Sequence, residues 1–184
     1  MGKLSKYLLE SNGFGYVWNN QAVDNERDFI KLFRKRLCDV FIQDWHREVN
    51  LTSDGRLFKH IKHIFAYESY LNLNNRALRV SISKIRLSSH LFLVERGRWG
   101  GNRIERRDRL CPICTCIEDE FHCLLECPRF NNERLGLLSD YIRKDKTIQN
   151  FVKFLSTEDL SEQRRLGILC LKVQKEYRET VINA

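Results

Sequence analysis

The sequence has few residues that would interrupt a regular fold. Only two of its 184 residues are proline, and no segment is of low complexity. Its longest apolar runs, such as LFLV and LGILCL, are much shorter than the roughly 20 residues of a membrane-spanning helix. The first residues, MGKLSKYLLESNG, also lack the continuous apolar segment of a secretion signal. We therefore expect an intracellular protein, nuclear or cytoplasmic, that is neither secreted nor bound to a membrane.

Apolar residues recur at intervals of three and four through most of the chain, which is typical of amphipathic helices. This spacing predicts helices over residues 24–50, 56–72, 76–96, 128–143, 148–155 and 162–178. No segment alternates as a half-buried strand does, so the fold class is predicted to be mainly α with little or no β. Cys38 and Cys170 lie on the apolar stripes of two of these helices, and we interpret both as core residues.

Charge is distributed unevenly along the chain. The net charge is +8, and residues 76–110 alone hold ten basic and three acidic residues. Residues 111–133 hold five acidic residues and one arginine, so the basic block borders an acidic segment. A local basic block of this kind favours an anionic partner such as nucleic acid, although charge runs are more often only a solvated surface.

The acidic segment also holds five of the seven cysteines, in the stretch LCPICTCIEDEFHCLLECPRF. Clustered cysteines in a reducing compartment are more often metal ligands than disulfides. Four of the residues form the pattern C-x2-C-x7-H-x4-C, and they are Cys111, Cys114, His122 and Cys127. Three thiolates and one imidazole suit tetrahedral Zn²⁺, and four protein ligands leave no open position for catalysis. The spacing therefore predicts one structural zinc ion per chain.

Other interpretations of the same stretch stay open at this stage. Cys116 could replace Cys114 as a ligand, and Cys123 could replace His122. The cysteines could also form a metal-free core or disulfides. Because Cys127 precedes a proline, its backbone is disfavoured in the helical region, and a break there would let it face the same ion as His122. The acids at residues 118–120 suit the first turn of a short helix that carries His122.

The predicted organisation is one multi-helix domain with an inserted CCHC loop module. Residues 1–97 form an N-terminal helical part, and residues 98–130 form a basic loop followed by the zinc module. Residues 131–184 form C-terminal helices that pack on the same core. The basic loop begins at GRWGGNR, whose glycines suit the end of a helix and an irregular backbone.

The basic block supplies the candidate contacts to nucleic acid. Arginines bind phosphates, and an exposed aromatic ring can stack on an unpaired base, so we expect recognition of shape or of single strands. Alternatively, the charges form only a solvated helix face and loop, and the tryptophan is a core anchor. The candidate residues are Lys84, Arg86, Arg96, Arg98, Trp99, Arg103, Arg106, Arg107 and Arg109.

Several segments together resemble the region that follows the polymerase domain in the reverse transcriptases of non-LTR retrotransposons. They are RVSISKIRLSSHLFLVERGRW, NRIERRDRLCPIC and EDEFHCLLECPRFNNER, with further similarity in GFGYVWNNQAV, FIQDWHREV and LGILCLKV. The resemblance implies a zinc-binding, nucleic-acid-associated module whose partners are RNA or DNA and the rest of a reverse transcriptase. It matches Cys111, Cys114, His122 and Cys127 to the zinc ligands, and Cys123 departs from the pattern.

The carboxylates of nucleic-acid enzymes are missing from this sequence. Polymerases hold two Mg²⁺ ions with acidic side chains, and no two aspartates are adjacent in the chain. No clustered set of acids points to an endonuclease or to RNase H either. We therefore expect a protein that is not an enzyme and has no small-molecule substrate. The alternatives are a structural or protein-interaction zinc module, or a degenerate fragment of a retroelement without activity of its own.

Overall fold

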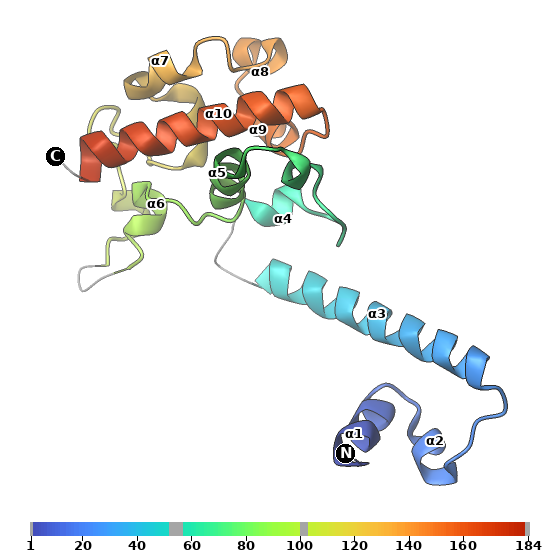
Figure 1. The fold of residues 1–184 in the computed structure, drawn as a ribbon. Coiled ribbons are helices and arrows are strands. Elements are labelled where there is room, and N and C mark those ends of the chain that lie inside the picture. The colour runs from blue at the N-terminus through green and yellow to red at the C-terminus, as the bar shows by residue number, and fades with distance from the viewer. Residues whose placement is uncertain (1, 52–56, 100–102, 183–184) are drawn as a thin grey trace. The chain divides into compact units, whose positions relative to one another are not determined.

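The computed structural model describes residues 2–51, 57–99 and 103–182, and the chain divides into two compact units, residues 1–51 and 52–184. The regular structure of the described residues is helical (Figure 1). The one pairing of extended backbone among them is an isolated antiparallel bridge between Leu110 and Ile117. The mainly α fold class is thus confirmed. The unit boundary follows the first long helix, which the sequence had grouped with the later ones. The start of the predicted helix at residue 56 and the glycines at 100 and 101 lie outside the described residues.

Unit 1 consists of α1 (Gly2–Ser11), α2 (Gly15–Asn20) and α3 (Glu26–Leu51). The side chain of Asn25 caps α3 by accepting from the amides of Arg27 and Asp28, at 3.0 and 3.3 Å. The ring of Phe14 packs edge-on against Phe29 and Phe33, with ring centroids 5.7 and 5.3 Å apart. The predicted helix over 24–50 is therefore confirmed.

The assignment of Cys38 on α3 to a core is wrong. Its side chain is exposed, because only the face of α3 that carries the phenylalanines is partly covered. No described residue of α3 is fully buried. Cys170, by contrast, is completely buried in unit 2, as predicted.

Unit 2 is built around the contact between α5 (Arg76–Arg86) and α10 (Leu160–Tyr177), its most extensive helix pairing (Figure 1). The two helices approach closely because α10 has Gly167 where it meets α5. A Cβ atom at that position would stand only 2.9 Å from the Cβ of Leu78. The apolar faces of both helices point into one continuous core, which includes Ile82, Ile85, Leu166, Leu169, Val173 and Tyr177.

The predicted helix over 56–72 is wrong. The described part of this segment holds only α4 (Phe58–Ile61) and the 3₁₀ helix η1 (Ser69–Asn72). Lys62 leaves the helix with extended backbone angles, and its ammonium group pairs with Glu68 at 2.8 Å. Glu68 also binds Arg86 at 2.9 Å, so an ion-pair network organises the loop. Ile64 and Phe65, which were expected to face inward, are exposed.

The predicted helix over 76–96 is interrupted in the middle. It ends with α5 at Arg86 and resumes as α6 (Leu93–Arg96). Between them, Ser88 adopts a left-handed conformation with φ of 51°. The Ser88 hydroxyl and Nε2 of His90 both lie 2.8 Å from Oε1 of Glu120, and these contacts fix the connection. Glu120, which is 30 or more residues away in the sequence, thus fixes the segment that interrupts the helix. A local sequence pattern does not reveal such a distant partner.

The C-terminal helices are partly as expected. Helices α9 (Ile148–Leu155) and α10 confirm two predictions, and the side chains of Thr147 and Asp159 cap them. The predicted helix over 128–143 is wrong, because Gly136 takes a left-handed turn with φ of 70°. In its place are η4 (Pro128–Phe130), α7 (Asn131–Arg134) and α8 (Asp140–Lys144). The remaining short elements are η2 (Arg106–Asp108), η3 (His122–Glu126) and η5 (Arg178–Ile182).

Candidate metal centre and basic segment

A tight turn carries the first two candidate ligands. The amide of Thr115 donates to the carbonyl of Cys111 at 2.8 Å, and Thr115 is left-handed with φ of 56°. The amide of Cys111 then donates to the carbonyl of Cys116 at 2.7 Å. The chain doubles back next to the bridge between Leu110 and Ile117. This geometry holds Cys111 and Cys114 at the two sides of one short loop.

A wide helical turn carries the other two ligands. The segment η3 is a π-helix, in which the amide of Cys127 donates to the carbonyl of His122 at 2.8 Å. The Asp119 carboxylate accepts from the amide of His122 at 2.9 Å and so caps the start of the turn. Cys127 leaves the helix with φ of −56° and ψ of 120°, which confirms the expected break before Pro128. The π-turn itself was not predicted from the spacing.

The four candidate ligands come together in space. One sulfur or nitrogen atom from each of Cys111, Cys114, His122 and Cys127 lies within 4.8 Å of the other three. The sulfurs of Cys111 and Cys127 are 3.9 Å apart, close to the sulfur separation of about 3.8 Å that Zn–S bonds of ~2.3 Å give in a tetrahedron. Cys114 is partly buried and the other three are buried. The cluster could therefore hold a metal ion.

The two spare cysteines have different surroundings. Cys123 is completely buried and belongs to the apolar core of unit 2, so it packs there. Cys116 is exposed, and its sulfur lies 3.1 Å from Nδ1 of His122. Every cysteine is a free thiol, and all seven lie within the described residues. Of the two alternative ligands, Cys116 is thus the one at the edge of the cluster.

The electrostatics of the cluster suit a bound cation. Burial and, to a lesser extent, the adjacent sulfur of Cys111 raise the pKa of Cys127 to about 12, while a hydrogen bond from the amide of Arg129 acts in the opposite direction. Burial and Cys111 also raise the pKa of Cys114. Without a cation, these thiols therefore keep their protons. A metal ion would replace the protons and offset the charge of the thiolates.

Arg134 supports the cluster from behind, and sequence reasoning missed it. Its buried guanidinium donates to the carbonyls of Leu124, at 2.9 Å, and Cys127. Both carbonyls lie at the end of the π-turn, and that of Cys127 also accepts from the amide of Phe130 at 3.1 Å. Burial lowers the pKa of Arg134, while the neighbouring sulfurs of Cys127 and Cys123 act in the opposite direction. The guanidinium of Arg134 on α7 thus fixes the backbone of the segment that carries Cys127.

The turn at residues 111–115 and the residues up to the π-turn, which we call the metal loop, are connected to the rest of unit 2 by two of the three acids at 118–120. Glu118 is buried and accepts from the amide of Leu93 at 3.0 Å and from the hydroxyl of Tyr177 at 2.7 Å. Glu120 pairs with His90, as described above. Only Asp119 acts purely as a helix cap. Glu118 therefore does not start the helix as expected, and it fixes the loop to α6 and α10.

The candidate basic residues separate into buried and exposed groups. Arg86 is buried and donates to the carbonyl of Leu155 at 2.8 Å. Arg109 is also buried and donates to the carbonyls of Val94 and Ile104, at 2.6 and 2.9 Å. Both guanidinium groups are used inside the fold, so these two arginines leave the candidate interface. Lys84 lies in the wall of a groove between α5 and α10.

The remaining candidates lie in residues 96–99 and 103–107, which we together call the arginine segment. Trp99 is 67% exposed, so it is not a core anchor. Arg98 pairs with Glu95 at 3.0 Å and lies over the Trp99 ring, 5.7 Å from its centroid. The other members are all exposed, and they are Arg96, Arg103, Arg106 and Arg107.

Comparison with known proteins yields no relative. No family model, no curated protein and no solved structure matches the chain. Within residues 2–51, 57–99 and 103–182, none of the helices has the length and apolar character needed to cross a bilayer.

Proposed function

We propose that the metal is a single structural Zn²⁺ ion held by Cys111, Cys114, His122 and Cys127. Three sulfurs and one imidazole nitrogen are the donors that zinc prefers, and the 3.9 Å between the sulfurs of Cys111 and Cys127 is close to a tetrahedral separation. With four protein ligands, zinc would contribute to folding and would not activate water. It would join the turn at residues 111–115 to the π-turn at 122–126.

The zinc proposal is tested by metal analysis of matched cysteine variants. The purified chain should contain about one zinc per molecule, as a single four-ligand site requires. Cys127→Ser should lose the metal and destabilise unit 2. Cys116→Ser is the control and should retain the metal, because this sulfur is not one of the four. Metal-free, fully folded wild-type protein would refute the proposal. Loss of the metal in Cys116→Ser would show that Cys116 is a ligand and that the proposed set of four is wrong.

We further propose that unit 2 is a non-enzymatic module that binds single-stranded or structured nucleic acid through the arginine segment. The observation that carries this is the exposed Trp99 among five arginines on one short, anchored stretch. The anchors are the buried Arg109 and the hydrogen bond from the amide of Ile104 to the carbonyl of Gly97, at 2.9 Å. Arginines would bind phosphates while the indole stacks on a base.

The resemblance to retrotransposon reverse transcriptases supports the same proposal. A module of that origin would hold template RNA or target DNA for a polymerase located elsewhere. The second candidate, a protein-interaction zinc module, is favoured by the exposed aliphatic face on α5 and α10. That face is distinct from the arginine segment, so the two functions are compatible in one unit.

Binding of labelled single-stranded RNA and DNA, measured by fluorescence anisotropy over a range of salt concentrations, tests the nucleic-acid proposal. The logarithm of the binding constant falls linearly with the logarithm of the salt concentration, and each phosphate contact to a single strand contributes roughly 0.7 to the slope. The triple variant Arg103→Ala, Arg106→Ala, Arg107→Ala should therefore reduce the magnitude of this slope by about 2. The matched control replaces three exposed cations of other helices, Lys144, Arg164 and Lys172, and should bind as wild type does. No binding at low salt, or equal loss in both triple variants, contradicts the proposal.

A further inference from the structure

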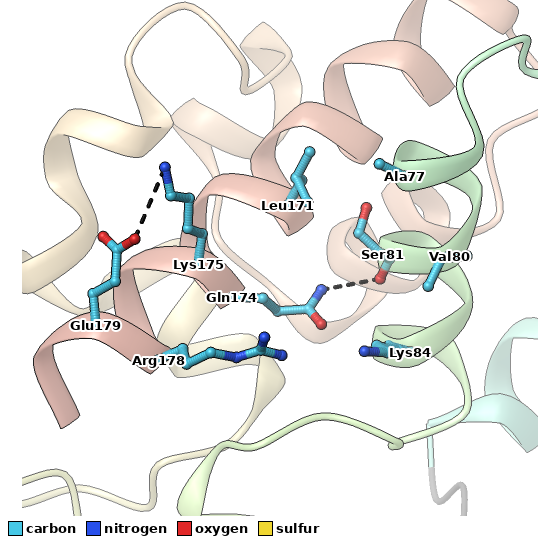
Figure 2. A pocket seen from close by; sticks show the side chains of 9 residues that line it. All are labelled: Ala77, Val80, Ser81, Lys84, Leu171, Gln174, Lys175, Arg178 and Glu179. Atoms are coloured by element: carbon cyan, nitrogen blue, oxygen red, sulfur yellow. Dashed lines mark hydrogen bonds and ion pairs between the residues drawn. The ribbon is translucent and has the colours of Figure 1, made fainter. Parts of the chain in front are cut away.

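A solvent-exposed groove runs between α5 and α10. Its volume is about 450 Å³, and its apolar lining comes from Ala77 and Val80 on α5 and Leu171 on α10 (Figure 2). Val80 is 41% exposed and Leu171 is 37% exposed, although both lie on helices whose other faces form the core. No residue of the groove is a candidate metal ligand or belongs to the arginine segment. The groove is thus an uncovered apolar surface with no role in either proposed site.

One end of the groove is positively charged. Lys84 from α5 and Arg178 from η5, directly after α10, point toward one another across it (Figure 2). Neither forms an ion pair with any acid in the part of the chain that the structure describes. Lys175, by contrast, is paired with Glu179 at 3.8 Å. Two facing cations repel each other, and a carboxylate placed between them would turn this repulsion into attraction.

The apolar surface continues on the other side of α5. A shallower groove of about 300 Å³ shares Val80 and Lys84 with the first and is also lined by Leu71 and Leu87. Arg76 and Arg79 border it. Val80 of α5 therefore lies between two apolar grooves that have basic side chains along their edges. Surfaces of this composition bind amphipathic segments of opposite charge.

We propose that this face docks an acidic amphipathic helix of a protein partner. Leucine-type side chains of that helix would lie on Ala77, Val80 and Leu171, and a glutamate or aspartate would bind between Lys84 and Arg178. The charge complementarity of the basic end selects an acidic partner. Nucleic acid fits this groove less well, because no aromatic ring lines it and base stacking requires one.

The test uses the full chain and three labelled synthetic helical peptides. The first has a leucine stripe and glutamates, the second has the same stripe with lysines, and the third has the composition of the first in scrambled order. The glutamate peptide should bind, and both others should bind at least tenfold more weakly. Leu171→Asp should weaken binding at least tenfold. Leu160→Asp is the control, because it adds the same charge to an exposed position of α10 outside the groove.

Charge reversal adds a test that does not depend on loss of binding. The double variant Lys84→Glu, Arg178→Glu should lose the glutamate peptide and gain the lysine peptide, with circular dichroism as the check of folding. The proposal is overturned if wild-type protein ignores the glutamate peptide or if Leu171→Asp binds it as wild type does. Displacement of the peptide by single-stranded RNA would assign the groove to nucleic acid and also overturn it. The arginine-segment triple variant should bind the peptide unchanged, which separates this proposal from the nucleic-acid one.

Discussion

Replacing Arg134 by methionine should show whether the fold of the cluster depends on this buried guanidinium. The substitution keeps most of the apolar stem and removes every donor of the fork. The buried carbonyl of Leu124 would lose its partner, whereas the carbonyl of Cys127 would keep the amide of Phe130, at 3.1 Å. Each unsatisfied buried polar group costs about 1–3 kcal/mol. One such group, together with the loss of a second hydrogen bond worth about 0.5–1.5 kcal/mol, predicts a loss of about 1.5–4.5 kcal/mol in the free energy of unfolding, a large part of the stability of a small domain.

Loss of the positive charge beside the thiolates should also weaken the metal site. Changes in residues that support metal ligands typically reduce affinity by about 10–100-fold. Arg134→Lys would keep the charge and lose the planar fork, so it should be intermediate in stability and close to wild type in metal affinity. Comparing the two variants therefore separates the charge of Arg134 from its hydrogen-bond geometry.

Urea denaturation of the metal-loaded chain and competition with a chelator measure these two effects. Arg143→Met is the matched control, because Arg143 is exposed and pairs with the exposed Asp140 on its own helix. It should cost no more than about 0.5 kcal/mol. If Arg134→Met is as stable as this control, then the carbonyls of the π-turn do not depend on Arg134, and the reasoning is refuted.

Three further predictions concern α10 and its N-terminal cap. Gly167→Ala should destabilise unit 2 by about 1–3 kcal/mol in chemical denaturation, because its Cβ would meet Leu78 at 2.9 Å; an unchanged midpoint would show that the helices can separate at no cost. Tyr177→Phe should cost about 1–2 kcal/mol by the same assay, since the buried Glu118 loses a hydroxyl donor; an unchanged stability would count against this contact. Hydrogen bonds from Ser161 and Glu162 lower the pKa of Asp159, so its cap is stabilising above the ordinary pKa of 3.8 and is lost as pH falls through the lowered value. Thermal melts of wild type and Asp159→Ala should therefore differ near pH 7 and converge in acid, and a constant difference would contradict the role of this charge.

The long helices were predictable because their signals are local. Apolar stripes and capping residues define α3, α9 and α10 within a window of a few turns. The helix breaks were not predictable, because distant partners cause them. Lys62 leaves its helix to pair with Glu68, and the segment after Arg86 bends toward Glu120. A local pattern carries no information about such contacts.

The candidate site shows the same division. The spacing of four residues was enough to select the side chains that come together in the structure, because a tight turn and a helix break follow from short-range rules. Within the basic block, however, Arg86 and Arg96 look equivalent in the sequence. Arg86 binds the carbonyl of Leu155, 69 residues away, and Arg96 is exposed. The excess of basic residues identified the block at residues 76–110. The packing of the fold is needed to distinguish the arginines that are buried in it from those that are accessible.

The metal loop and the arginine segment share the same supports. Arg109 ends the basic block, donates to the carbonyl of Val94, and accepts at its own carbonyl from the amide of Glu118. Glu118 in turn binds the amide of Leu93, at the start of α6. Cys111 follows Arg109 by two residues, so a displaced metal loop would remove the anchor of the arginine segment. A structural ion would thus act on any bound nucleic acid indirectly, through the backbone that positions the arginines, and not by contacting it.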